Sequence, residues 1–280
     1  FAQRLSGYKR QPLSLFLLIV VCLSALLTVG VLLFLIGYIL VNGIPNIKPE
    51  LFEWEYNTDN VSMLPSMINT LYMTGLTLLM AVPVGIFSAI YMVEYAKRGS
   101  KLVKIVRTTT ETLQGIPSIV YGLFGYLMFV IGCHWGYTLM AGAITLAIMV
   151  LPVIMRTTEE ALLSVPDSYR EGSFGLGAGR LRTVFVIVLP SAMPGIFSGI
   201  ILAIGRIVGE TAALIFTAGT VATAATGVMD STRTLAVHMY CLLSEGLYMK
   251  QAYATAVILL VMVLVINAVS GMIAKKFTKK

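Results

Sequence analysis

Arg206 and Glu210 are the residues whose placement most directly suggests chemistry, because they are the charged residues of an otherwise uncharged run, residues 191–219. They are four apart, so on a helix they would share one face. A charge at membrane depth costs about 2.5–3.5 kcal/mol on insertion scales and usually lines a water-filled path. The two could instead fasten a helix bundle, but that would not explain why a costly pair is present at all. Gly205 and Gly209 beside them would let a ligand or another backbone approach closely, so we predict a path for a polar solute.

A second stretch, residues 171–190, is polar, basic and punctuated by glycine, and it separates two long apolar runs. Residues 169–176 favour a helix, and Gly177 and Gly179 suit the left-handed or flexible positions past a helix end. Arg180 and Arg182 then start a second segment, whose apolar part is residues 184–189. The pattern predicts a helix, a turn and a helix, and on these features alone it is also compatible with a simple solvated connection.

Composition places the chain in a membrane. It is 58% hydrophobic and 12% charged, with a mean hydropathy of +0.88, whereas a soluble domain is about 25% charged. The net charge of +7 does not indicate nucleic-acid binding, because Lys and Arg cluster at the ends of apolar runs. The two histidines and three cysteines have no metal-ligand spacing, although a bond between Cys133 and Cys241 remains possible. The sequence has no P-loop motif and no set of residues typical of a hydrolase active site, so we do not expect an enzyme.

Uncharged runs predict six membrane-spanning helices. About 20 apolar residues span the hydrocarbon, and the run over residues 112–155 is too long for one span, so we divide it at the turn 132–136. The first run exceeds the 7–15 apolar residues of a signal peptide, so we interpret it as a retained span. Between the last two spans, residues 220–250 form a segment whose middle, 235–243, is apolar enough for a short helix. The remaining spans fall within residues 13–41, 61–93, 191–219 and 251–274.

The distribution of positive charge predicts the topology. Of the 20 Lys and Arg residues, all but Lys48, Arg206, Arg233 and Lys250 fall in segments that lie on the same side as the N-terminus. The positive-inside rule then puts both termini and the loop 171–190 in the cytoplasm. We divide the all-α integral membrane protein into residues 1–60, a transmembrane helix with an acidic extracytoplasmic loop, and a core of five further spans, residues 61–280, that carries the loop 157–190.

The spacing within residues 171–190 resembles the signature loop of ABC-importer permeases. In that family a Glu-Ala-Ala opening is followed by Gly and later by Ile-x-Leu-Pro. Here Glu171, Gly177, Ile187 and Leu189-Pro190 match in register, whereas Gly172-Ser173 replaces the two alanines. The resemblance implies a type I ABC-importer permease fold whose cytoplasmic coupling helices sit in a cleft on separate ATPase subunits. The residues that it implies for ATPase coupling are Arg170, Glu171, Gly172, Ser173, Leu176 and Gly177.

Residues 205–218, GRIVGETAALIFTA, narrow the resemblance to the PstA-type permeases of phosphate-specific ABC importers. Residues 117–123, 156–159 and 165–171 also match, and the similarity extends from about Leu64 to Ala274. It implies a bacterial inner-membrane chain that works with a PstC-like second permease, two PstB-like ATPases and an extracytoplasmic PstS-like phosphate-binding protein. ATP and Mg²⁺ would be used by the ATPases, and this chain would bind no cofactor of its own.

In that scheme Arg206 would hold the phosphate anion bidentately. Glu210 would hold Arg206 when the path is empty and would accept a hydrogen bond from a protonated phosphate oxygen, which sulfate lacks at neutral pH. Gly205, Gly209 and Thr211 would complete the path. Two alternatives remain open: a permease for another oxyanion, such as molybdate or sulfate, and an ion-coupled secondary transporter, although no convincing repeat relates the two halves of the sequence.

Overall fold

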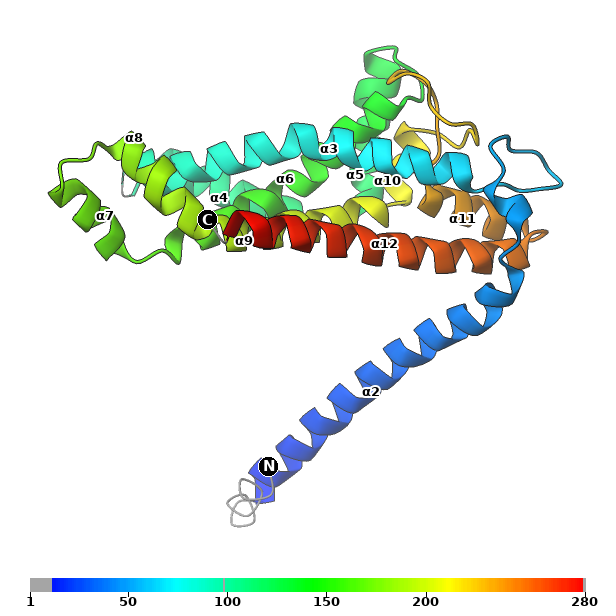
Figure 1. Cartoon of the computed structure of the whole chain (residues 1–280), viewed down its shortest axis with the longest axis horizontal. Helices are drawn as coiled ribbons and strands as arrows, with labels where there is room; N and C mark the ends of the chain where they lie inside the picture. Colours follow the sequence, from blue (N-terminus) through cyan, green and yellow to red (C-terminus); the bar gives the residue numbers. More distant parts are fainter. Residues whose placement is uncertain (1–11, 98, 279–280) are drawn as a thin grey trace.

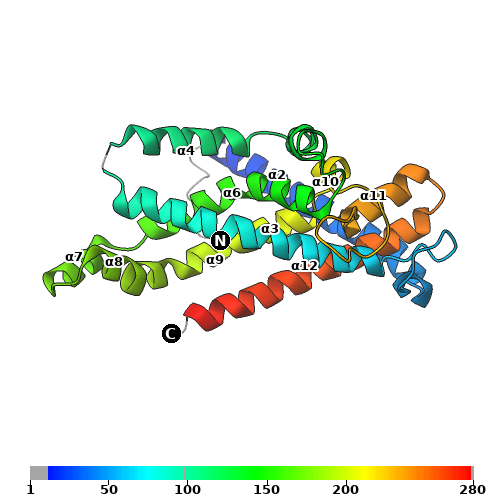
Figure 2. The same ribbon diagram turned by 90° about the horizontal axis from the view of Figure 1, so that it is seen from above.

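The computed structural model describes residues 12–97 and 99–278, and these form an elongated helical bundle without a β-strand (Figure 1). Three long helices make its centre: α3 (Leu64–Ile90), α6 (Leu139–Leu163) and α9 (Leu189–Val208). α6 packs against both of the others, and α12 (Met249–Thr278) lies along α9. Figure 2 shows α3, α6, α9 and α12 running side by side along the long axis. The all-helical fold is confirmed.

The first predicted span is confirmed as a single long helix, α2 (Pro12–Gly43), but it leaves the bundle (Figure 1). None of its most apolar window is buried within the chain. Only its last turns touch α12, where a Cβ on Gly43 would come 2.5 Å from the carbonyl oxygen of Tyr253. The apolar sides of α2 are therefore left to lipid or to another subunit.

The third span is broken in a way that the sequence analysis did not predict. α4 (Lys101–Gln114) ends before Pro117, and the chain bends by 105° there before α5 (Ser118–Gly125) begins. α5 then continues directly as a π-helical turn (Tyr126–Gly132). Within the described residues five helices are long and apolar enough to cross a membrane, or up to six if this bent pair is one span. The predicted turn at residues 132–136 is confirmed, and Cys133 and Cys241 are both free thiols.

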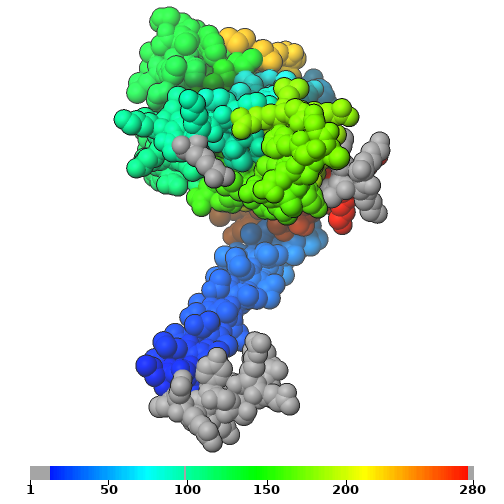
Figure 3. All heavy atoms as spheres, turned by 90° about the vertical axis from the view of Figure 1, so that its left-hand side faces the viewer, coloured from blue at the N-terminus to red at the C-terminus, as the bar shows by residue number. Residues whose placement is uncertain are grey.

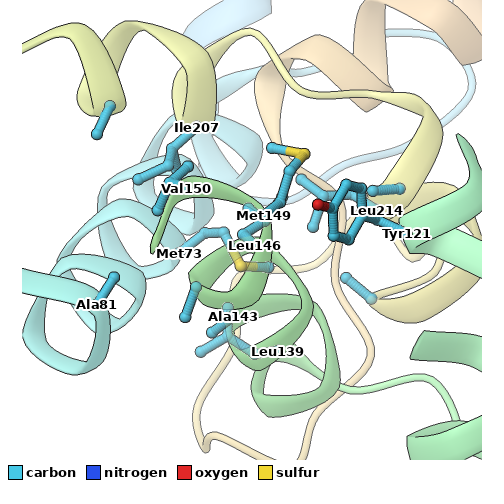
Figure 4. Packing of buried hydrophobic residues seen from close by; sticks show 14 of the residues in the cluster. Met73, Ala81, Tyr121, Leu139, Ala143, Leu146, Met149, Val150, Ile207 and Leu214 are labelled. Carbon is cyan, nitrogen blue, oxygen red and sulfur yellow. The ribbon is translucent and has the colours of Figure 1, made fainter. Parts of the chain in front are cut away.

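The main core lies where α3, α5, α6, α9 and α10 (Ala212–Thr217) meet. Figure 4 shows Leu146 and Met149 of α6 packed among Met73 of α3, Ile207 of α9 and Leu214 of α10. Glycine permits the closest helix contacts: a Cβ on Gly122 would meet the Cα atom of Ala213 at 2.8 Å. Because α10 packs directly on α5, residues just before α10 are held firmly in place.

The two ends of the bundle differ. One, here called the α7 end, carries α7 (Asp167–Gly175), α8 (Arg180–Thr183) and the last turns of α12. The opposite α11 end carries α11 (Leu235–Glu245), which confirms the predicted short helix, and the acidic loop. Two short 3-10 turns, Ile44–Asn46 and Pro49–Phe52, order that loop. The predicted terminal basic residues before Pro12 and after Thr278 lie outside the described residues.

Candidate translocation path and coupling region

The fifth span is interrupted at the predicted charged pair. α9 ends at Val208, residues 209–211 are not helical, and α10 then begins. The prediction that Arg206 and Glu210 share one helix face is therefore wrong, because Glu210 lies beyond the end of α9. The physical reason is local: the Glu210 carboxylate accepts a hydrogen bond from the backbone N–H of Ala213 at 3.1 Å and so caps α10.

Arg206 is left without an internal counter-ion. In the described part of the chain, no hydrogen bond or ion pair joins its guanidinium to any residue, including Glu210. Its helical neighbours Ala203 and Ile207 face the core, whereas a Cβ on Gly205 would meet nothing within 4 Å. Arg206 is half-buried beside the α9 face that this chain leaves uncovered.

The other predicted path residues gather at the same break. Gly209 caps the end of α9 and is exposed, and Thr211 is half-buried immediately before α10. Glu210 is 9% exposed. The structure thus brings Gly205, Arg206, Gly209, Glu210 and Thr211 together at one interruption, with the positive charge free and the negative charge used for capping.

The predicted helix–turn–helix at residues 171–190 is confirmed. Gly177 has a φ of +81°, the left-handed conformation expected past the end of α7. α8 continues through a π-helical turn (Val184–Val188) into α9, so one helical path leads from the turn to Arg206. Figure 3 shows this hairpin on the face of the α7 end.

Ser173 fastens the hairpin from within. Its hydroxyl lies 2.8 Å from that of Thr183, and the residue is 5% exposed. Its side chain points between α7 and α8, and its part in ATPase coupling stays a prediction. The departure from alanine at this position thereby has a physical account: the serine gains a hydroxyl partner that the family's alanine could not bind.

The tip of the hairpin is open. Leu176 is 91% exposed, Glu171 and Gly172 are exposed, and a Cβ on Gly172 would meet nothing within 4 Å. Phe174 adds further exposed apolar surface. Apolar side chains exposed together at the tip of a folded hairpin, here Phe174 and Leu176, are typical of a docking surface.

Arg170 is held by several hydrogen bonds within the chain. Its Nη2 donates to the Glu94 carboxylate at 2.7 Å and to the Leu162 carbonyl at 3.0 Å, and its Nη1 donates to the Val165 carbonyl at 2.8 Å. A weaker contact of 3.2 Å reaches Asp167. The part of Arg170 in ATPase coupling therefore stays a prediction. Its guanidinium ties the start of α7 to the ends of α3 and α6.

Sequence reasoning missed Glu94 as the partner of Arg170. Glu94 lies in the π-helical turn that ends α3 (Tyr91–Tyr95), and its side chain is 8% exposed. It is the first charged residue after the uncharged run 61–93, and this is the signal that could have found it. The sequence analysis also missed the ion pairs Arg107–Glu159 and Arg156–Glu160, which border a cavity of about 190 Å³ between α4 and α6.

Comparison with known families decides the class of the chain. Residues 81–280 match the family described as "Binding-protein-dependent transport system inner membrane component". The chain belongs to this family. It is accordingly a multi-pass inner-membrane component of a transport system, and the predicted ABC-importer permease is confirmed.

Individual relatives agree with this placement. The "Probable ABC transporter permease protein YqgI" of Bacillus subtilis is 34% identical over 92% of this chain and 94% of its own length. The "Phosphate transport system permease protein PstA" of Haemophilus influenzae is 32% identical over 77% of each chain. A third relative, "Phosphate transport system permease protein PstA 1" of Mycobacterium tuberculosis, is 39% identical over 55% of this chain and about half of its own. The PstA-type resemblance of the chain is thus confirmed.

Solved structures share the fold at low identity. A bacterial alginate ABC transporter in complex with an alginate pentasaccharide-bound periplasmic protein contains a chain with a TM-score of 0.64 and 18% identity, and the match covers 98% of each chain. A chain of the MetNI methionine ABC transporter matches 76% of this chain and 93% of its own with a TM-score of 0.60 and 20% identity. These matches show the type I importer-permease fold.

Proposed function

We propose that this permease forms part of the translocation path of an ATP-driven importer of inorganic phosphate. The observation that carries the proposal is Arg206, a guanidinium without an internal ion pair at the break of the fifth span. The PstA relatives, whose names describe phosphate transport, support the choice of substrate.

The chemistry of phosphate suits this position. A phosphate anion that enters the bilayer loses most of its hydration, and a guanidinium replaces water with two parallel charge-assisted hydrogen bonds. Because Glu210 is engaged with the Ala213 N–H, it leaves the positive charge of Arg206 available to an anion. The open space beside Gly205 gives the anion room to approach.

The surfaces that this chain leaves exposed are where the other subunits of the importer would bind. A second, PstC-like permease would cover the exposed face of α9, and two PstB-like ATPases would receive the Leu176 tip of each permease. A PstS-like phosphate-binding protein would dock at the α11 end. ATP and Mg²⁺ would be bound by the ATPases, and this chain would contribute no cofactor. The α7 end would face the cytoplasm together with both termini, as the distribution of Lys and Arg favours.

Two connections would transmit ATPase movement to the path. The first is the helical path from α8 through the π-helical turn into α9, which carries Arg206. The second is the Arg170–Glu94 ion pair, which joins α7 to α3. A rigid-body movement of the hairpin would therefore move α3 and α9 together.

Uptake of labelled phosphate at low external concentration tests the substrate. Cells that lack only this chain are compared with the same cells after the chain is restored, with and without excess sulfate or molybdate. The proposal expects uptake to depend on the chain and to be indifferent to both competitors. Unchanged phosphate uptake without the chain would move the substrate to another anion.

A further inference from the structure

The loop before α11 and the first turn of that helix enclose polar side chains that lack partners. In the part of the chain that the structure describes, nine buried side-chain nitrogen or oxygen atoms have no hydrogen-bond partner. Six of the nine belong to four residues, Thr232, Arg233, Thr234 and His238. Buried polar atoms in native proteins are nearly always paired, so such a concentration requires an explanation.

Arg233 is the most demanding member of this cluster. It is 5% exposed, and its Nε and Nη2 atoms are enclosed without an acceptor. Its guanidinium carbon lies 4.6 Å from the centre of the Tyr56 ring, a favourable cation–π contact that does not satisfy N–H donors. A buried guanidinium is stable when its charge is balanced and its donors are used.

His238 lies beside Arg233 and faces the same aromatic ring. It is fully buried, both of its ring nitrogens lack partners, and its ring meets Tyr56 edge-on at 6.2 Å. Burial, together with the charge of Arg233, lowers the pKa of His238 to about 3. The ring is therefore neutral at physiological pH and offers one donor and one acceptor.

The acidic residues nearby do not balance Arg233. Glu53 accepts a hydrogen bond from Asn60, Glu55 is exposed beside Tyr56, and Glu245 is exposed at the end of α11. None of the three forms an ion pair with Arg233 among the described residues. A negative charge from outside this chain would therefore balance Arg233.

A route for such an anion adjoins the cluster. A cavity of about 440 Å³ at the α11 end is lined by Trp54, Glu55, Tyr56, Ile68, Tyr72 and residues 223–226. The Asn69 side chain donates to the carbonyls of both Thr223 and Arg233, which ties the cavity wall to the cluster. Tyr56 thus belongs both to the cavity lining and to the aromatic cover of Arg233.

We propose that Tyr56, Arg233 and His238 form a receiving site for inorganic phosphate at the α11 end, ahead of Arg206. The proposal rests on the proposed function. Arg233 would donate two N–H groups to phosphate oxygens, and the unprotonated nitrogen of His238 would accept the P–OH hydrogen of hydrogenphosphate. The Thr232 and Thr234 hydroxyls would supply further hydrogen bonds. Sulfate, which has no such hydrogen at neutral pH, would leave the histidine acceptor unpaired.

The chain offers a clean spectroscopic test, because it contains only His134 and His238. The assembled complex is labelled with ¹⁵N-histidine in lipid, and the His238 signal is assigned by its loss in His238→Gln. Inorganic phosphate is expected to shift the His238 signal and to leave that of the exposed His134 unchanged. Sulfate at the same concentration is expected to produce no shift, and Arg233→Gln to abolish the response.

Transport provides the second measurement. Arg233→Gln is expected to raise the phosphate concentration for half-maximal uptake at least about tenfold, since two charge-assisted hydrogen bonds are lost. Lys250→Gln, an exposed basic residue near the same end, is the matched control and is expected to leave uptake unchanged. Co-purification of the subunits checks assembly. If Arg233→Gln fails to assemble, the same uptake measurement is made with Arg233→Lys.

The outcomes separate this site from the proposed function. If phosphate does not shift the His238 signal in a complex that still imports phosphate, the receiving site is overturned and the proposed function stands. Buried water would then be the partner of the unpaired polar atoms. A complex that shows the shift but imports no phosphate would overturn the transport proposal and, with it, the receiving role. A sulfate response equal to that of phosphate would overturn the role assigned to His238.

Discussion

Arg170 at the α7 end and Arg233 at the α11 end are both largely buried, yet their surroundings are opposite. Arg170 donates to the Glu94 carboxylate and to the carbonyls of Leu162 and Val165, whereas Arg233 has two enclosed nitrogen atoms without an acceptor. The comparison teaches that a buried arginine whose donors are all used holds elements together. Arg233, with two enclosed nitrogen atoms unused, would bind a partner from outside the chain.

The largest expected effect comes from breaking the satisfied arginine. Arg170→Gln leaves Glu94 buried without its counter-charge and should destabilise the junction by about 3–5 kcal/mol. Thermal unfolding of the assembled complex measures this loss, and ATP hydrolysis should continue without matching phosphate uptake. The control is Arg180→Gln in the same hairpin, where an exposed guanidinium only lies over the Tyr95 ring at 5.7 Å. Equal effects of the two substitutions would contradict a special role for Arg170.

The second effect concerns the exposed tip of the α7 end. Leu176→Asp places a charge in the surface that we expect an ATPase to bury, and loss of a central contact of about 2 kcal/mol lowers affinity about 30-fold. Leu247 is 81% exposed at the opposite end, so Leu247→Asp is a matched control. Co-purification of the ATPase with each variant measures the difference. Retention of the ATPase by Leu176→Asp would show that the tip is not the docking surface.

A third effect sharpens the account of the α11 end through pH. The pKa of His238 is lowered from 6.5 to about 3 by burial and by Arg233. Below pH 6.5 the unfolded chain therefore binds a proton that the folded chain refuses, and stability falls by about 1.4 kcal/mol per pH unit until the pH approaches 3. The thermal midpoint should fall between pH 6.5 and 5, and His238→Gln should remove that part of the fall. His134→Gln should not, and an unchanged slope in His238→Gln would argue against a buried neutral histidine.

The smallest expected effect lies inside the hairpin. Ser173→Ala restores the alanine of the family signature and removes the hydrogen bond to Thr183, which should cost about 1 kcal/mol because the threonine hydroxyl can still bond to the Gly179 carbonyl. The melting temperature of the complex is the measurement, with the exposed Ser198→Ala as control. A loss as large as that of Arg170→Gln would mean that the hairpin, rather than the ion pair, holds this end together.

Features with a local signal were predictable from the sequence. The length of the uncharged runs predicted the long helices, and the glycines after residue 176 predicted the turn of the hairpin. Features set by distant partners were not predictable: Glu94 and Arg170 are 76 residues apart, and nothing within residues 231–238 marks Arg233 and His238 as buried. The bend before Ser118 does have a local signal, because a proline such as Pro117 disfavours helical backbone at the residue before it.

The charged pair illustrates both cases. A functional role for Arg206 and Glu210 could be predicted from the sequence, because both are charged residues within an apolar run. Glu210 lies outside α9 because its carboxylate binds the Ala213 N–H instead of the guanidinium, and an i,i+4 spacing cannot distinguish these partners. The result strengthens the role of Arg206, because its charge is left free.

Phosphate transport by the reconstituted complex with Arg206→Gln tests the central claim most directly. The account predicts that transport is abolished while the subunits still assemble and the ATPase still docks. Glu210→Gln is the matched control, because an amide oxygen can still accept from Ala213, and it is expected to retain most transport. Full transport by Arg206→Gln would contradict the claim that this free guanidinium carries phosphate through the membrane.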